Sequence, residues 1–283
     1  MVAPAAAHAP PTLVQRRPAS ALLPYVSAYT GYRMDAGPPS THQGVPGAHL
    51  TFLLCLDGAV ELLRLPDPAR SPATFVAMVG GLHDRPAVIA QGAPQTGLQL
   101  RLTWRGARAL LGLPAGELAA DVVDLTALLG PRVATVLDQL ATTPTWDERF
   151  ALLDSLLGGL AAAGPGERGV QPEVGYAWDR LEESGGTLHI ADLAREVGWS
   201  RRHLAERFSR EIGLAPKSAA RLIRFEQACD RLRHPDRPPL AQVAAEAGYV
   251  DQSHLSRDFR TLADMTATQW LAERPDMIPA NAR

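Results

Sequence analysis

The first half of the chain carries short apolar runs separated by turn residues, which is typical of β-strands. The runs cover residues 50–56, 59–65, 75–79 and 87–90. Asp57-Gly58 lies between the first two runs and predicts a hairpin turn. Leu98, Leu100 and Leu102 alternate with polar residues, as in a strand with one buried face. Several short strands with regular turns predict a small β-barrel or sandwich.

From Trp104 onward the apolar residues recur with the period of an α-helix. The expected helices cover residues 105–111, 131–141, 146–160, 173–183, 190–197, 201–212, 216–232, 240–247, 252–262 and 267–273. Residues 161–172 are rich in glycine and proline, the composition of a linker, so we place a domain boundary there.

The helical part contains an internal repeat. Residues 192–199 (DLAREVGW) align with residues 242–249 (QVAAEAGY), and each copy is an amphipathic helix followed by glycine and an aromatic residue. A second helix follows each copy, with a leucine and a phenylalanine four positions apart and a histidine directly before the leucine. These residues are His203, Leu204 and Phe208 in the first copy and His254, Leu255 and Phe259 in the second.

Each copy has the features of a helix-turn-helix unit. Gly198 and Gly248 suit the left-handed backbone that ends a helix, and Ser200 and Asp251 can cap the helix that follows. Two such units in tandem are a specific signal, because a single helical hairpin can imitate one. The joining helix at residues 216–232 is roughly 25 Å long. That length can hold two recognition helices about one DNA turn, ~34 Å, apart.

These motifs resemble the DNA-binding domain of the AraC/XylS family. The resemblance rests on the two repeats, on Gly213–Lys217 (GLAPK), and on Asp251–Arg257 (DQSHLSR) with Phe259, and it covers roughly residues 186–273. Asp264 stands where the family usually has glycine, and Ala267 where it usually has proline. The resemblance implies a sequence-specific transcription regulator that binds double-stranded DNA. RNA polymerase is a candidate partner, and no cofactor is expected.

The first half is similar to the amino-terminal domains of actinobacterial AraC-like regulators, in the segments HLTF (49–52), GLH (81–83) and GLQL (97–100) and in Gly106 to Gly112. The resemblance implies a cupin-like barrel with flanking helices that senses a small-molecule effector or dimerises. The expected fold class is α+β, with an all-α carboxy-terminal domain of two helix-turn-helix units. The expected segments are a disordered tail (1–18), a sensing and dimerisation domain (19–160), the linker (161–172), the DNA-binding domain (173–275) and a second tail (276–283).

The exposed starts of the two recognition helices are expected to contact DNA. Base contacts are expected from Arg201, Arg202, Ala205 and Glu206 in the first helix and from Gln252, Ser253, Ser256 and Arg257 in the second. Phosphate contacts are expected from Ser200, Lys217 and Arg221. For Arg202 and Arg257 the alternative is a phosphate contact or an ion pair, with Glu206 and Glu273 as the candidate acids. Arg224 can instead serve structure by pairing with Asp192 or Glu226.

Composition limits the function classes. The formal net charge is −2, so the chain as a whole is not basic, although residues 200–224 carry seven basic and two acidic side chains. No apolar run reaches the ~18 residues of a membrane span. The start of the chain lacks the basic and apolar regions of a signal peptide, and its two cysteines have no metal-site spacing. A cytoplasmic location is therefore expected.

Three alternatives stay open at this point. His42, His49 and His83 are the candidates for a metal triad in a cupin-type enzyme, although the usual His-x-His spacing is missing. A DNA-repair protein would need a metal-held cysteine, for which Cys55 on an apolar run is unsuited. A regulator without any ligand would use its first domain only to dimerise or to bind protein. The apolar helix at residues 146–160 favours a homodimer, and packing of this helix inside its own domain is the alternative.

Overall fold

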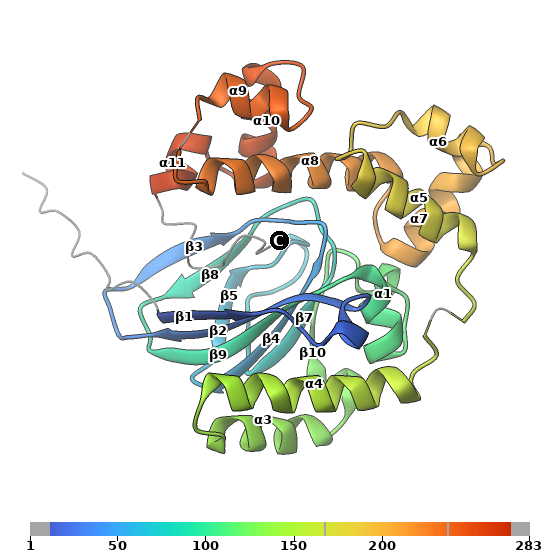
Figure 1. Cartoon of the computed structure of the whole chain (residues 1–283). Coiled ribbons are helices and arrows are strands. Elements are labelled where there is room, and N and C mark those ends of the chain that lie inside the picture. Colours follow the sequence, from blue (N-terminus) through green and yellow to red (C-terminus); the bar gives the residue numbers. More distant parts are fainter. Residues whose placement is uncertain (1–11, 167, 237, 273–283) are drawn as a thin grey trace, which may run out of the picture.

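The computed structural model describes residues 12–166, 168–236 and 238–272 (Figure 1). Strands occupy the first half and helices the second, which confirms the α+β class. Two antiparallel sheets form the amino-terminal half, and a long helix, α8 (Pro216–Arg233), crosses over them (Figure 1). In the part of the chain that the structure describes, every helix is too short or too polar to span a bilayer.

The two sheets face each other around an apolar interior. The larger has the strand order β1-β2-β9-β4-β7-β10, and the smaller has the order β3-β8-β5-β6. The strands are β1 (Thr12–Arg16), β2 (Val26–Met34), β3 (Ser40–Gly44), β4 (Leu50–Asp57), β5 (Val60–Arg64), β6 (Ala73–Phe75), β7 (Ala77–Gly80), β8 (Ala87–Gln91), β9 (Gln95–Leu102) and β10 (Val122–Asp124). Side chains alternate along a strand, so the larger sheet buries both faces. Leu54 and Leu98 pack on the helical side, and Leu53 and Met78 pack toward the smaller sheet.

The hairpin predicted at Asp57-Gly58 is wrong. β4 pairs with β7 and β9, whereas β5 pairs with β6 and β8 in the other sheet. Gly58 has a φ of 76° and turns the chain from one sheet to the other. Two apolar runs joined by a turn look the same in sequence whether the strands pair or change sheets. Burial of Leu53 and Leu62 in a shared core favours the change of sheet.

The expected amino-terminal tail is also wrong for its last part. Thr12–Arg16 form β1, which pairs along β2, and the Arg16 guanidinium binds the Asp154 carboxylate at 3.3 Å. Val14 packs against the core, which favours an ordered edge strand over an exposed tail. Residues 1–11 and the second expected tail, 276–283, lie outside the described residues.

Two helices cover the outer face of the larger sheet (Figure 1). They are α3 (Arg132–Thr142) and α4 (Trp146–Ala163), and α4 begins with a capping box made by Thr145 and Glu148. The Phe150 ring of α4 stacks on Tyr29 of β2 at a centroid distance of 5.9 Å. The other elements of this half are η1 (Ser20–Leu22), α1 (Trp104–Gly106), η2 (Ala107–Leu111), η3 (Ala115–Leu118) and α2 (Leu125–Leu129).

The carboxy-terminal half is helical. Its helices are α5 (Pro172–Glu183), α6 (Ile190–Glu196), α7 (Arg201–Ile212), α8, α9 (Leu240–Glu246), α10 (Gln252–Leu262) and α11 (Ala267–Ala272). The ends lie within a residue or two of the predicted ones, because glycines and capping side chains mark them locally. Between the halves, α4 ends at Ala163 and α5 begins at Pro172.

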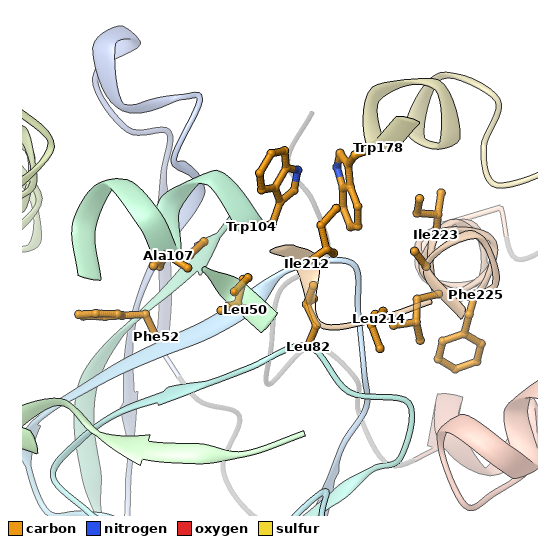
Figure 2. Close-up of a cluster of buried hydrophobic side chains, with 14 of the residues drawn as sticks. Leu50, Phe52, Leu82, Trp104, Ala107, Trp178, Ile212, Leu214, Ile223 and Phe225 are labelled. Carbon is orange, nitrogen blue, oxygen red and sulfur yellow. The ribbon is translucent and has the colours of Figure 1, made fainter. Parts of the chain in front are cut away.

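The two halves share one apolar core. Figure 2 shows Leu82 and Trp104 of the first half beside Trp178, Ile212 and Leu214 of the second, in one continuous cluster of buried side chains. The backbones also touch, since a Cβ added at Gly116 of η3 would lie 2.1 Å from the carbonyl oxygen of Arg210 in α7. The carboxy-terminal helices are therefore fixed against the sheets rather than suspended from a linker.

Candidate nucleic-acid interface and internal cavity

Both predicted helix-turn-helix units are present. Helices α6 and α7 form the first and α9 and α10 the second, at opposite ends of α8 (Figure 1). Gly198 and Gly248 lie in the turns with φ of 72° and 74°, as predicted for left-handed stops. The Ser200 hydroxyl accepts a hydrogen bond from the His203 amide at 3.2 Å, and the Asp251 carboxylate accepts one from the His254 amide at 2.7 Å. These bonds confirm the two predicted helix caps.

The same side-chain contacts set the helix angle in each unit. Leu204 and Phe208 are fully buried in the first unit, and Leu255 and Phe259 are buried in the second. The aromatic residue after each glycine meets the following histidine edge to face, with centroid distances of 4.7 Å for Trp199 and His203 and 5.0 Å for Tyr249 and His254. The two histidines, His203 and His254, thus serve packing.

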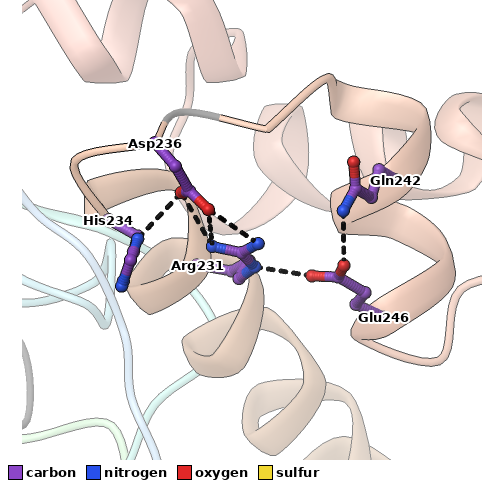
Figure 3. Close-up of polar contacts among 5 residues, drawn as sticks. All are labelled: Arg231, His234, Asp236, Gln242 and Glu246. Atoms are coloured by element: carbon purple, nitrogen blue, oxygen red, sulfur yellow. Dashed lines mark hydrogen bonds and ion pairs between the residues drawn. The ribbon is translucent and has the colours of Figure 1, made fainter.

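Helix α8 joins the units, and its 18 residues span about 27 Å at 1.5 Å per residue. Near its end, Arg231 binds Asp236 at 2.9 Å in the next loop and Glu246 at 2.6 Å in α9, while Gln242 supports Glu246 (Figure 3). This network holds the first helix of the second unit against the end of α8. The position of the second unit is therefore set by charge pairs as well as by packing.

A cavity of about 180 Å³ lies between the two sheets, and residues of α8 and α11 also line it. Its walls are apolar, with Leu53 and Met78 from the larger sheet and Leu62 and Ile89 from the smaller one. Its polar lining includes Gln95, Gln99 and Arg101 of β9, His42, His49 and His83, and Glu226, Cys229 and Arg233 of α8. The cavity is therefore built by both halves of the chain.

The Arg101 guanidinium of β9 is the centre of the polar end. It forms an ion pair with Glu226 of α8 and donates to Nδ1 of His49 at 2.9 Å. The amide of Ala48 donates to the other Glu226 oxygen at 3.1 Å. Burial, and then the charges of Arg101 and Arg233, hold the pKa of His49 well below its usual value, so its ring is neutral and accepts from Arg101. The Glu226 carboxylate is thus clamped by groups of the amino-terminal half.

Comparison with known proteins supports the assignment of the helical half. The sequence profile of a family described as a helix-turn-helix domain matches residues 193–273. The chain is 34% identical over 84 residues to YbfI of Bacillus subtilis and 26% identical over 88 residues to a protein of Staphylococcus aureus, both named uncharacterized HTH-type transcriptional regulators. These matches cover 29% and 31% of this chain, but only 30% and 12% of the relatives' own length.

Most of the chain is similar in fold to ToxT from Vibrio cholerae. One ToxT structure superposes with a TM-score of 0.51 at 10% identity and covers 88% of this chain and 98% of ToxT. A second, of a singly substituted ToxT without ligand, gives a TM-score of 0.52 at 12% identity and covers 91% of this chain and 99% of ToxT. Other ToxT structures are described as bound to an unsaturated fatty acid and to (E)-4-(8-methylnaphthalen-1-yl)but-3-enoic acid.

The carboxy-terminal helices form an AraC-type helix-turn-helix domain. The structure places the residues predicted to read bases on the accessible starts of its two recognition helices. Arg201, Arg202 and Glu206 are exposed on α7, and Ala205 is half-exposed. Gln252, Ser253 and Arg257 are exposed on α10, and Ser256 is half-exposed. Arg202 forms an ion pair with Glu206 at 2.9 Å, which is the alternative partner weighed for both side chains.

The residues predicted to bind phosphate divide into two kinds in the AraC-type domain. Lys217 is exposed at the start of α8, and Ser200 caps α7. Arg221 instead donates to Asp258 of α10 at 2.8 Å, and that carboxylate is only 6% exposed. Arg224 donates to the carbonyl of Gly186, so it serves structure through a partner other than the two acids considered for it.

Sequence reasoning missed two features that bear on function. Val250 is 87% exposed in the turn before α10 of the AraC-type domain. The turn of the second repeat is one residue longer than that of the first, and this length difference was the signal for Val250. Gln95, Gln99 and Arg101 are buried although they are polar, because they point into the cavity. Polar residues at alternate positions of a central strand were the signal for that cavity.

The three histidines proposed for a metal triad all line the cavity. Among the described residues, no group of three or more His, Cys, Asp or Glu side chains is arranged to hold a metal ion. Burial lowers the pKa of His42 and of His83 to about 4, so both rings are neutral near pH 7. Cys55 is buried, and burial raises the pKa of its thiol, which disfavours the thiolate that a nucleophile or metal ligand requires.

Proposed function

We propose that the protein is a ligand-responsive transcription regulator that recognises a specific DNA sequence. The observation that carries this proposal is the pair of capped helix-turn-helix units with accessible recognition helices at the two ends of α8. An axial length of about 27 Å for α8 suits successive major grooves on one side of a duplex. A single chain would then contact two neighbouring segments of its operator.

In the proposed complex the base edges are read from the starts of α7 and α10. The residues assigned to the bases are Arg201, Arg202, Ala205 and Glu206 in α7 and Gln252, Ser253, Ser256 and Arg257 in α10. A two-pronged contact to guanine suits both Arg202 and Arg257. Lys217 and Ser200 are assigned to phosphate contacts. Arg221 is not assigned to a phosphate, because its guanidinium binds the Asp258 carboxylate. Val250, beside the start of α10, suits contact with a thymine methyl group.

Effector response is supported by the cavity. It lies in the amino-terminal half, yet Glu226, Cys229 and Arg233 of α8 line it, so a bound molecule touches the helix that joins the two DNA-binding units. ToxT, which is similar in fold, has been solved with an unsaturated fatty acid bound. A regulator that acts without a ligand, through dimerisation or protein binding alone, is the second candidate.

We further propose a homodimer, formed through α4, that works in the cytoplasm and contacts RNA polymerase. Ala151, Ser155 and Gly159 of α4 are exposed, and Leu152 and Leu156 between them are only half-buried. Such a face is more apolar than a solvated helix requires. Sedimentation of the full chain at micromolar concentration tests the dimer, and a monomer would contradict it.

Selection of duplexes from a random library by the purified full-length chain tests the proposed function. We expect enrichment of one motif with two segments about one helical turn apart. The double variant Arg202→Ala/Arg257→Ala is the control and should lose the selected motif while staying folded. Failure of the folded chain to bind any duplex at low salt would refute the proposal.

A further inference from the structure

The polar end of the cavity contains two buried guanidinium groups. The side chains of Arg101 and Arg233 are 9% and 15% exposed, and both line the cavity. The Nε atom of each is buried without a hydrogen-bond partner among the described residues. A buried donor that lacks an acceptor costs free energy, and a buried cation needs a negative partner. This end of the cavity is therefore suited to an anion with several oxygen atoms.

Two carboxylates of α8 neutralise the positive charges of these arginines. Glu226 pairs with Arg101, and Asp230 pairs with Arg233 at 3.3 Å. With both carboxylates in place the four charges cancel. An anion that enters the cavity and binds Arg101 thus has to take the place of Glu226, because a third buried negative charge would be repelled.

Glu226 is also one of the contacts that fasten α8 to the amino-terminal half. Its two oxygens meet Arg101 and the Ala48 amide, both of which belong to that half. Further ion pairs between the halves lie away from Glu226: Arg108 binds Glu211 at 2.6 Å, Arg105 binds Asp179 at 2.9 Å, and Arg64 binds Asp264 at 3.0 Å. Removal of Glu226 from Arg101 therefore loosens the contact at the middle of α8, between the two DNA-binding units.

We propose that Arg101 is the anchor for the carboxylate of a small apolar acid, and that Glu226 occupies this anchor when the acid is absent. The acid displaces Glu226 and releases the middle of α8 from the amino-terminal half. The expected effect of the acid on DNA binding rests on the proposed function. Beyond that function, the inference names the chemical class of the ligand and the contact through which the ligand acts on α8.

The cavity sets the size of the acid. Its volume of about 180 Å³ is somewhat larger than the ~150 Å³ of an engineered apolar cavity that binds benzene. The apolar walls, with Leu53, Leu62, Met78 and Ile89, therefore suit one aromatic ring or a chain of about six carbon atoms. An acid of this size places its body between the sheets and its carboxylate at Arg101.

Calorimetric titration of the full-length protein tests the anchor. The probes are phenylacetate and hexanoate, each compared with its neutral amide. We expect the acids to bind and the amides to bind much more weakly. The variant Glu226→Gln keeps the shape of the side chain and removes its charge, so it should bind the acids about tenfold more tightly, since the anchor is no longer occupied.

Glu211→Gln is the matched control, because it also removes an ion pair between the halves but lies away from the cavity lining. It should leave the affinity for the acids unchanged. If Glu226→Gln does not fold, Glu226→Asp, which withdraws the carboxylate from Arg101 by one methylene group, should tighten binding in the same direction. Equal binding of acid and amide, or no gain from either substitution at Glu226, would overturn the proposal.

Titration with an operator duplex tests the coupling. Addition of phenylacetate to the wild type and the substitution Glu226→Gln without ligand should shift the affinity for the duplex in the same direction. An acid that binds and leaves the affinity for DNA unchanged would overturn the coupling to α8. The calorimetric test needs no DNA, so failure of the proposed regulator function would show as a lack of DNA binding while the anchor is still measured.

Discussion

At the scale of single residues, the basic side chains of the AraC-type domain differ in whether they have a partner inside the protein. Arg221 is bound to a buried carboxylate of α10, and Arg224 is bound to the carbonyl of Gly186. Arg257 and Lys217 are exposed and form no ion pair with any described residue, and Glu273, the acid weighed as a partner for Arg257, lies outside the described residues. Only cations of the second kind are available to DNA without loss of an internal partner. This difference separates substitutions that weaken DNA binding from substitutions that weaken the fold.

Substitution of Arg257 should lower the affinity for the operator sequence and leave the affinity for other DNA sequences unchanged. Arg257→Ala is expected to cost roughly 1–3 kcal/mol of binding free energy on the operator, because a two-pronged contact to one base is lost. Lys217→Ala should weaken operator and scrambled duplex alike and lower the salt slope by about one unit. Titrations at several salt concentrations measure both. Equal losses for the two variants on both duplexes would contradict the docking of α10 in the groove.

Substitution of Arg221 should act on stability. Arg221→Ala leaves the Asp258 carboxylate, which is 6% exposed, without its cation. We expect a loss of about 2 kcal/mol in the free energy of unfolding, less than for a fully buried pair because Arg221 is 30% exposed. Urea unfolding measures it. The double variant Arg221→Ala/Asp258→Ala should recover part of the loss, and a loss that the second substitution leaves unchanged would show that the pair is not its cause.

At the scale of elements, the turn between α10 and α11 explains one departure from the family pattern. Asp264 has a φ of 58°, the left-handed conformation that glycine adopts without strain. Aspartate tolerates this conformation better than most residues, and its carboxylate also binds Arg64 of β5. The turn is therefore retained with aspartate in the place of glycine. Ala267, in the place of the usual proline, is buried at the start of α11.

At Asp264 the backbone conformation, rather than the ion pair with Arg64, should determine how much a substitution changes the stability. Asp264→Ala is expected to lower the free energy of unfolding by about 1 kcal/mol, because alanine is strained at positive φ. Asp264→Asn and Asp264→Gly should stay within about 0.5 kcal/mol of the wild type, since both tolerate the conformation and the lost ion pair is exposed. Thermal unfolding compares the three. If Asp264→Asn lowers the stability as much as Asp264→Ala, the loss would come from the ion pair with Arg64 and not from the backbone.

At the scale of the whole molecule, the contact between η3 and α7 fixes the two halves. A Cβ at Gly116 would overlap the Arg210 carbonyl, so Gly116→Ala must separate these elements. We expect a loss of about 1–3 kcal/mol in stability and faster proteolysis between residues 164 and 171. Gly158→Ala on α4, where nothing lies within 4 Å of the added atom, is the control and should be neutral or stabilising. Unchanged proteolysis of Gly116→Ala would contradict a fixed arrangement of the halves.

The half-buried histidine His42, which lines the cavity, should make stability fall in acid. The folded pKa of His42 is about 4, below the ordinary 6.5, so the unfolded chain binds more protons between these values. The contribution is fully present above pH 6.5 and is lost as the pH falls toward 4. Urea midpoints at pH 7 and pH 5 should therefore differ by less in His42→Gln than in the wild type. An equal difference in the two proteins would refute the assignment to His42.

The sequence by itself determined the features that depend on neighbouring residues. Gly198 and Ser200 mark a turn and a cap within a few positions, and the repeat of the same pattern about fifty residues later predicted both DNA-binding units. Helix ends in the carboxy-terminal half followed from the same local interactions, whose energies do not depend on the rest of the fold.

Only the tertiary structure decided which distant residues meet. It placed β4 and β5 in different sheets, turned Arg221 toward Asp258, and brought Arg101 of β9 to Glu226 of α8. These contacts join segments far apart in the chain, and they form because whole sheets and helices bury their apolar faces together. No local pattern encodes such a pairing, so the cavity and its charged end became visible only when the layers were assembled.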